Sequence, residues 1–242
     1  MRILVTRPPG DAEALAALLR SRGHHPVLSP AMEIRLLPGA DIPLAGVQAI
    51  LATSANGIRA LSPRTRERTL PVFAVGPQTA AAAQGAHFAN VIEGGGDAAA
   101  LALTVADSLD PAAGTLLHAA GRERTGELAR RLEAAGFLLR VEVLYVAVPV
   151  ARLSPAAADA LRAGEIDAVL FFSPRSARLL IDQVTAAQLA EHCRAITAFC
   201  ISRTTAEAAA ALPFAAVQIA SAPNQDAMLA LLSSPCSPRA RP

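Results

Sequence analysis

Short apolar runs alternate along this chain with longer segments of helical character. Seven runs have the length and composition of buried strands: 2–6, 27–31, 48–53, 71–75, 115–119, 167–172 and 196–201. Each run leads into a segment that favours a helix, and this alternation predicts parallel sheets with helices on both faces. Because one such sheet would use only half of the 242 residues, we expect two α/β domains.

The same pattern of apolar and polar positions occurs twice. Residues 1–28 align without gaps on residues 114–141, and we call these two copies repeat A. Gly23 and Gly136 fall opposite each other, each just after a helical segment, where a left-handed residue ends the helix. Three further matches make up the two copies of repeat B: 48–61 with 167–180, 73–83 with 199–211, and 90–103 with 217–232. The order A, B, A, B indicates a fold that is built twice.

Composition excludes several kinds of chemistry. All 22 basic side chains are arginine, which removes every mechanism that needs a lysine amine, including Schiff-base aldolases, pyridoxal-phosphate enzymes and P-loop phosphate binding. The three cysteines, Cys193, Cys200 and Cys236, do not have the spacing of a zinc site, and the five histidines form no H-x-x-x-H pair. We therefore expect no metal.

Charge and hydropathy narrow the range of partners. The net charge is +2, and only one Tyr and no Trp are available to stack on bases, so nucleic-acid binding is disfavoured. An anionic small molecule suits the excess of arginine better. The chain has no run of the roughly 20 strongly apolar residues that a membrane span needs. The N-terminus also lacks the apolar core of a signal peptide. We therefore expect a cytoplasmic protein.

Four short, hydroxyl-rich loops follow strands and precede helices. A parallel sheet binds ligands outside the carboxyl ends of its strands, and a helix N-terminus offers unpaired N–H groups that suit a carboxylate or phosphate. The alternative is that these side chains only cap their helices, which stabilises each helix by about 1 kcal/mol. The candidate residues in these loops are Thr53, Ser54, Asn56, Gly76, Gln78, Thr79, Ser173, Ser176, Ser202, Thr204 and Thr205.

Arginine residues and one tyrosine complete the candidate site. Arg7 closes the first strand, while Arg122 and Arg124 follow Gly121 at the end of another. Each guanidinium can fork onto a carboxylate, or it can be a solvated surface group. Tyr145, the only tyrosine, is either a packing residue or a proton donor beside the ligand. The sequence shows no nucleophile elbow and no paired-carboxylate cluster, so an enzyme of this kind would act by binding and shaping its substrate.

Six segments occur in order along nearly the whole chain: ILVTRPPGDAEALAALLRSRGHHPVLSPAMEI, ILATSANGIRAL, AVGPQTAAAA, HAAGRERTGELARRLEAAGFLLRVEVLYVAV, AVLFFSPRSARLL and ISRTTAEAAA. Together they resemble the uroporphyrinogen-III synthase family. The resemblance implies two similar flavodoxin-like α/β domains joined by a two-stranded connector near 28–36 and 141–148. It implies a discontinuous first domain of 1–35 plus 148–235 and a second domain of 36–147. The polar, proline-rich composition of the C-terminus predicts a flexible tail, 236–242.

The resemblance also implies an activity. The family closes hydroxymethylbilane, a linear tetrapyrrole with eight carboxylates, into uroporphyrinogen III, with loss of water and inversion of ring D, and it uses no metal or organic cofactor. It implies a monomer that takes this small molecule and engages neither nucleic acid nor membrane. Because the electron-rich pyrrole expels the leaving hydroxyl easily, the enzyme's task is to favour one ring-closing geometry, which donors to the carboxylates can do.

Several candidate residues fall on motif positions of the family. These are Arg7, Ser54, Thr79, Ser173 and Thr205. Tyr145 matches the connector tyrosine, which would assist departure of the hydroxyl. Two positions depart from the pattern: Ser202 stands where the family commonly has glycine, and Arg124 lies three residues after Gly121 where four are expected.

Two other hypotheses stay open on the sequence. A non-enzymatic bilobal binding or sensor protein would hold an anionic small molecule with the same loops and would not turn it over. A flavodoxin-like nucleotide-binding protein is the weaker alternative. The chain has no G-x-G-x-x-G loop, and EGGGD at 93–97 lacks the framing of one.

Overall fold

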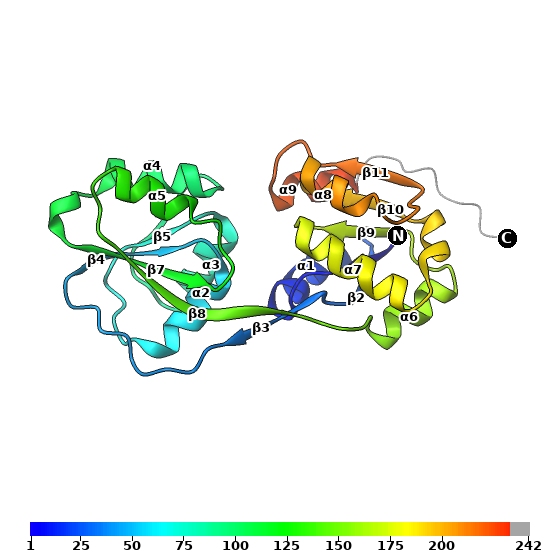
Figure 1. Ribbon diagram of the computed structural model, residues 1–242, viewed down its shortest axis with the longest axis horizontal. Coiled ribbons are helices and arrows are strands. Elements are labelled where there is room, and N and C mark those ends of the chain that lie inside the picture. The colour runs from blue at the N-terminus through cyan, green and yellow to red at the C-terminus, as the bar shows by residue number, and fades with distance from the viewer. Residues whose placement is uncertain (233–242) are drawn as a thin grey trace. The chain divides into compact units, whose positions relative to one another are not determined.

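The computed structural model describes residues 1–232. The end of the expected first domain, 233–235, and the expected flexible tail, 236–242, lie outside the described residues. The described chain forms two compact domains (Figure 1). The first domain consists of Met1–Glu33 and the described residues from Val148 onward, and the second domain is Ile34–Ala147.

The first domain has a parallel sheet with the strand order β11-β10-β9-β1-β2. Its strands are β1 (Arg2–Val5), β2 (His25–Leu28), β9 (Ala168–Phe171), β10 (Thr197–Cys200) and β11 (Ala216–Ile219). Its helices are α1 (Pro9–Ser21), α6 (Pro155–Arg162), α7 (Pro174–Ala186), α8 (Arg203–Ala209) and α9 (Gln225–Leu231), with a 3-10 turn at Ala190–Ala195. Leu15 of α1 and Met228 of α9 pack with Ile3, whereas Leu180 of α7 packs with Leu4, which points to the opposite face of β1. Helices therefore cover both faces of the sheet (Figure 1).

The second domain repeats this plan with one additional strand, in the order β3-β8-β7-β4-β5-β6. Its strands are β3 (Met32–Leu36), β4 (Val47–Ala52), β5 (Val72–Ala74), β6 (Val91–Glu93), β7 (Thr115–Gly121) and β8 (Leu139–Pro149). Its helices are α2 (Ala55–Leu61), α3 (Pro77–Gly85), α4 (Ala98–Ser108) and α5 (Glu127–Ala134), with 3-10 turns at Ser62–Arg64 and Pro111–Ala113. Ile58 of α2 packs with Leu117, whereas Leu101 of α4 and Leu128 of α5 pack with Leu116 on the other face of β7. The expected α/β fold with two mostly parallel sheets is confirmed.

The chain passes from one domain to the other within β3 and β8. The N–H of Leu37 donates to the carbonyl oxygen of Leu144 at 2.8 Å, and the N–H of Val150 donates to that of Ala31 at 3.0 Å. Residue numbers rise along one strand as they fall along the other, so the two strands run antiparallel, unlike the parallel pairs of both sheets. This antiparallel pair corresponds in sequence to the connector that the resemblance implies.

The central strands of the two sheets pair in the same register. Ile3 in β1 lies opposite Ala168 in β9. Its partner in repeat A, Leu116 in β7, lies opposite Ala49 in β4, which is the partner of Ala168 in repeat B. Each domain thus combines one copy of repeat A with the copy of repeat B from the other half of the chain, so aligned positions of the central strands can be compared between the domains.

Candidate functional site

A pocket of about 230 Å³ lies at the carboxyl ends of β4 and β7 in the second domain. Four candidate residues from the sequence line it: Thr53, Ser54, Arg124 and Tyr145. His118 of β7 also lines it, although the sequence analysis gave that residue no role in binding. The starts of α4 and α5 contribute Ala98 and the residues 123–126. This pocket contains both a cationic group and hydroxyl donors, so we take it as the candidate site.

The pocket owes part of its wall to a loop where the first domain has a helix. In repeat A, Arg122 aligns with Pro9, the first residue of α1, yet α5 starts only at Glu127. Proline at the start of α1 presets a helical backbone, and the second copy has no proline there. Gly126 has φ +72°, a left-handed conformation that favours glycine and separates the loop 122–126 from the helix. The missing helical turn leaves residues 123–126 to line the pocket.

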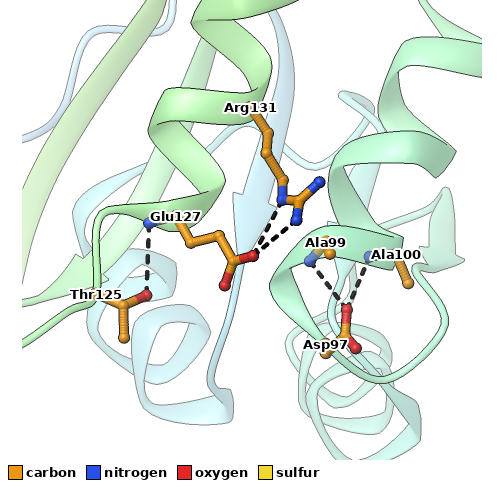
Figure 2. Close-up of polar contacts among 6 residues, drawn as sticks. All are labelled: Asp97, Ala99, Ala100, Thr125, Glu127 and Arg131. Carbon is orange, nitrogen blue, oxygen red and sulfur yellow. Dashed lines mark hydrogen bonds and ion pairs between the residues drawn. The ribbon is translucent and has the colours of Figure 1, made fainter.

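The helices beside the pocket begin in different ways, as Figure 2 shows. One carboxylate oxygen of Asp97 accepts the N–H groups of Ala99 and Ala100 at 2.9 and 2.8 Å, so the first turn of α4 is capped from within the chain. At α5 the N-cap is Gly126, and the hydroxyl of Thr125 accepts the N–H of Glu127 at 3.5 Å. The Glu127 carboxylate is in turn held by the guanidinium of Arg131 at 3.0 Å. Its charge is therefore balanced within α5.

Arg124 brings a positive charge to the pocket. Its Nη1 donates to the main-chain oxygens of Gly121, at 3.4 Å, and of Arg122, at 3.2 Å. Among residues 1–232 no carboxylate forms an ion pair with Arg124. Carbonyl oxygens orient a guanidinium but do not neutralise it, so this cation is available to an anionic ligand. Arg122 is exposed and does not line the pocket.

Tyr145 is positioned by a glycine and by an irregularity in the sheet. A Cβ atom at Gly121 would lie 2.7 Å from Cζ of the Tyr145 ring and 2.9 Å from its hydroxyl oxygen, so only glycine lets the ring take this place. The register between β7 and β8 shifts between Ala120 and Gly121. The main-chain oxygen of Tyr145 accepts the N–H of Arg122 at 2.9 Å. The structure thus gives Gly121 the role of admitting the tyrosine ring.

His118 and Thr53 form a polar pair inside the pocket. Nε2 of His118 lies 3.2 Å from the hydroxyl oxygen of Thr53. Only 4% of the His118 surface is exposed. Burial, and to a smaller degree the charge of Arg124, lowers the pKa of His118 from 6.5 to about 4. The imidazole is therefore neutral near pH 7, with one ring nitrogen that donates a hydrogen bond and one that accepts.

Three of the candidate serine hydroxyls serve as helix caps. Ser54 accepts the N–H of Asn56 at 3.1 Å, and Ser173 accepts that of Ser176 at 3.1 Å. In α8, Ser202 accepts the N–H of Thr205 at 3.3 Å, and its hydroxyl also bonds those of Thr204, at 3.0 Å, and Thr205, at 2.9 Å. Capping is therefore the observed local role of Ser54, Ser173 and Ser202.

The loop between β5 and α3, which corresponds in repeat B to the loop with Ser202, lacks such a cap. Gly76 is the N-cap of α3 and has no side chain to accept a hydrogen bond, so the N–H of Thr79 bonds only the Gly76 main-chain oxygen, at 3.0 Å. Thr79 is buried, and Gln78 is half-buried beside it. Within the second domain these residues stand at the end of β5, and they are absent from the lining of the pocket.

Arg7 has protein partners in the first domain. Its guanidinium forms an ion pair with Asp11 at 3.1 Å, donates to Gln225 at 3.1 Å and stacks over the ring of Phe172, 4.6 Å from the ring centroid. These contacts join the start of α1 to the end of β9 and the start of α9. In this structure Arg7 therefore ties three elements of its domain together.

The part of the chain that the structure describes contains neither a metal cluster nor a membrane helix. No group of three or more His, Cys, Asp or Glu side chains in residues 1–232 is placed to hold a metal ion. No helix among the same residues is both long and apolar enough to cross a membrane.

Comparison with known proteins supplies an independent finding. The family described as uroporphyrinogen-III synthase HemD matches residues 13–230. Among solved structures, uroporphyrinogen-III synthetase from Helicobacter pylori 26695 is similar at 20% identity and a TM-score of 0.64, over 97% of this chain and 99% of that one. A mutant uroporphyrinogen III synthase from Thermus thermophilus matches at 19% identity and a TM-score of 0.47, over 96% and 97% of the two chains. No curated protein sequence matches the chain. At these identities the first structure bears on the fold, and the family match bears on membership.

Proposed function

This chain belongs to the uroporphyrinogen-III synthase family, and from that membership we infer that it is a cyclising lyase of haem biosynthesis, which closes hydroxymethylbilane into uroporphyrinogen III with inversion of ring D. The observation that carries this inference is the family match over residues 13–230, which spans both domains. The pocket agrees with a substrate that carries eight carboxylates, because it holds a cation that no carboxylate of the described chain balances. The alternative of a non-enzymatic sensor has no observation of its own.

We propose that the pocket binds one carboxylate-bearing side chain of the substrate. Arg124 would supply the charge, and the hydroxyls of Thr53 and Thr125 would add neutral donors on the pocket wall. About 230 Å³ is enough for a short carboxylate arm and too little for a tetrapyrrole. The other candidate residues would bind the remaining carboxylates. These residues are Arg7, Arg122, Asn56, Gly76, Gln78, Thr79, Ser173, Ser176, Ser202, Thr204 and Thr205.

We propose that Tyr145 donates a hydrogen bond to the hydroxyl that leaves the substrate. In this step the bond between the methylene carbon and the hydroxyl oxygen breaks, electrons from the adjacent pyrrole form the new double bond, and the hydroxyl leaves as water after taking up a proton. The neutral phenol donates this hydrogen bond to the departing oxygen without itself being ionised. The ring stands against Gly121, so the position of its hydroxyl is fixed by the backbone.

We propose that the protein acts as a monomer in the cytoplasm. Each domain is completed by segments of its own chain, and a role in haem biosynthesis supports a soluble enzyme. Light scattering after gel filtration should give the mass of one chain, 24.9 kDa. A mass of two chains would contradict the monomer without touching the activity.

One product assay tests the function. Hydroxymethylbilane, freshly made, is mixed with the pure protein, and the two uroporphyrinogen isomers are separated after oxidation. We expect the type III isomer, with heat-denatured protein as the control that gives only the type I isomer of unaided closure. Type I alone from the native protein, at the unaided rate, would overturn the proposal. Tight binding of the bilane with no turnover would favour the sensor.

A further inference from the structure

The polar pair His118–Thr53 has an apolar counterpart in the other half of the chain. His118 aligns with Val5 in repeat A, and Thr53 aligns with Phe172 in repeat B. The sheet registers confirm the equivalence, because His118 lies opposite Leu51 as Val5 lies opposite Leu170. Val5 is fully buried, and Phe172 packs against the same core cluster.

The comparison shows that this fold does not need a polar pair at that place. A buried imidazole gives up its hydrogen bonds to water, and one bond to a hydroxyl returns only part of that free energy. The first domain builds the same sheet register with Val5 and Phe172. A role in packing alone therefore leaves the choice of His118 and Thr53 unexplained, and the pocket that both residues line offers another role.

The direction of the hydrogen bond between His118 and Thr53 follows from the presence of a substrate carboxylate. A threonine hydroxyl has a single proton, and a carboxylate only accepts. If Thr53 donates that proton to a carboxylate, its oxygen is left to accept from the histidine. Nε2 of His118, 3.2 Å away, is the ring nitrogen that can donate to it. The neutral imidazole must then be the tautomer that carries its proton on Nε2.

We propose that His118 is a positioning residue, whose Nε2–H donates to the Thr53 hydroxyl and directs the only proton of that hydroxyl toward a carboxylate of the substrate. This role rests on the proposed function, because it requires a carboxylate in the pocket. The other charged or titratable groups that line the pocket are Glu123 and Arg124 of the loop and Tyr145 of β8. Burial lowers the pKa of His118 to about 4, so the imidazole acts as a fixed dipole across neutral pH.

Four variants form a test by double-mutant cycle. His118→Leu removes the donor at similar volume, Thr53→Val removes the hydroxyl, and the third variant combines both changes. His118→Gln keeps an N–H donor near the place of Nε2. Each single loss should lower kcat/KM about tenfold, mainly through a higher KM, because the carboxylate contact exists before and during the reaction. The double variant should be no worse than Thr53→Val alone, and His118→Gln should recover most of the loss.

A matched control separates positioning from stability. The Thr6 hydroxyl is buried and donates to the main-chain oxygen of Leu170 at 3.0 Å, but it lies in the first domain. Thr6→Val should lower the unfolding midpoint and leave kcat/KM within twofold, or about 0.4 kcal/mol. Should His118→Leu behave like this control, or should the double variant lose about a hundredfold, the two single losses would be independent and the proposal would be overturned.

A second measurement needs no variant. Nitrogen chemical shifts of the unmodified protein, assigned to His118, report which ring nitrogen carries the proton. We expect the proton on Nε2 at pH 7, and a proton on Nδ1 would overturn the proposal even if His118→Leu does not fold. The failure of the proposed function is a different result: the unmodified protein would then yield only the type I isomer. If it yields type III while the His118 variants keep their activity, only the positioning role fails.

Discussion

The joint between β5 and α3 and the joint between β10 and α8 are the same element in two copies, and they treat their donors differently. In the second domain, Gly76 leaves the N–H of Thr79 with only a main-chain partner. In the first domain, the hydroxyl of Ser202 accepts the N–H of Thr205 and bonds two threonine hydroxyls. A serine at the cap satisfies donors within the protein that a glycine leaves to other partners.

The same contrast extends to the arginines and to the strand ends. Arg7 in the first domain is balanced by Asp11, whereas Arg124 in the second faces its pocket with carbonyl partners only. Val5 in the first domain corresponds to His118 in the second. At the carboxyl ends of their strands, the first domain pairs an arginine within the protein, whereas the second presents an arginine and a histidine to a pocket. The difference predicts that substitutions in the second domain affect catalysis more than stability.

The largest expected effect comes from a methyl group at Gly121. Gly121→Ala places a Cβ atom within 2.9 Å of the Tyr145 hydroxyl, so the ring must move. We expect kcat to fall about a hundredfold, as for a displaced catalytic group, and the free energy of unfolding to fall by about 1–3 kcal/mol from overpacking. Steady-state kinetics and urea unfolding measure the two effects. Gly85→Ala, at a helical site with no atom within 4 Å of the added carbon, is the control and should keep full activity.

The next largest effect is on the pH dependence of stability, to which His118 of the second domain contributes and its counterpart Val5 cannot. The pKa of His118 is about 4 when folded and 6.5 when unfolded, so between these values the unfolded chain binds more protons and stability falls as the pH falls. At pH 5 this one residue should cost about 2 kcal/mol relative to pH 8. Urea unfolding of the unmodified protein and of His118→Leu at both pH values gives the difference. Equal losses in the two proteins would show that His118 is not the source.

The arginines offer a third comparison. Arg124→Gln should raise KM about tenfold with little change in stability, because the group has no carboxylate partner among the described residues. Arg7→Gln should instead lower the unfolding midpoint of the first domain, since it leaves Asp11 without this cation. Arg130→Gln, at an exposed position of α5 that does not line the pocket, is the control and should change KM less than twofold. A larger loss at Arg130 than at Arg124 would contradict the assignment.

The smallest effects concern the two joints themselves. Gly76→Ser introduces a hydroxyl where the backbone is extended and the nearest atom to a Cβ lies 3.8 Å away. It should stabilise α3 by a few tenths of a kcal/mol and lower kcat/KM about threefold, because the new cap takes the N–H of Thr79. Ser202→Gly should cost a few tenths of a kcal/mol and change kcat/KM less than Gly76→Ser does. Unfolding and kinetics of both variants, together with the double variant, measure these differences.

The fold could be predicted from the sequence because the two copies of each repeat share one pattern of apolar positions. Ile3 and Leu116 are both fully buried at equivalent register positions, so the apolar pattern alone revealed the duplication. Short edge strands are harder to predict. β6 has only three residues, and β11 exposes Val217 and Ile219, so neither shows a buried run. Neither was among the seven strands expected from the pattern.

The site was less open to prediction because its geometry depends on local backbone conformation and on distant partners. The sequence analysis placed Arg122 and Arg124 at the end of a strand, and the left-handed Gly126 that delays α5 has no signature beyond the glycine itself. His118 lies in an otherwise apolar run, and its partner Thr53 is 65 positions away. The available signal was the mismatch with Val5 inside the repeat. For Arg7, the spacing to Asp11 is an i,i+4 ion pair that the sequence already displays.

The interleaved order of the repeats affects the order in which the two domains fold during synthesis on the ribosome. The second domain, Ile34–Ala147, is one continuous stretch and can fold as soon as it emerges. Ile3 of β1 must wait for its neighbour Ala168. At about 5–20 residues per second, that delay is on the order of ten seconds, during which β1, β2 and α1 have no sheet to join. The second domain should therefore fold before the first. A chain released early would carry a folded second domain, preceded by one helix and two strands that have no sheet to join.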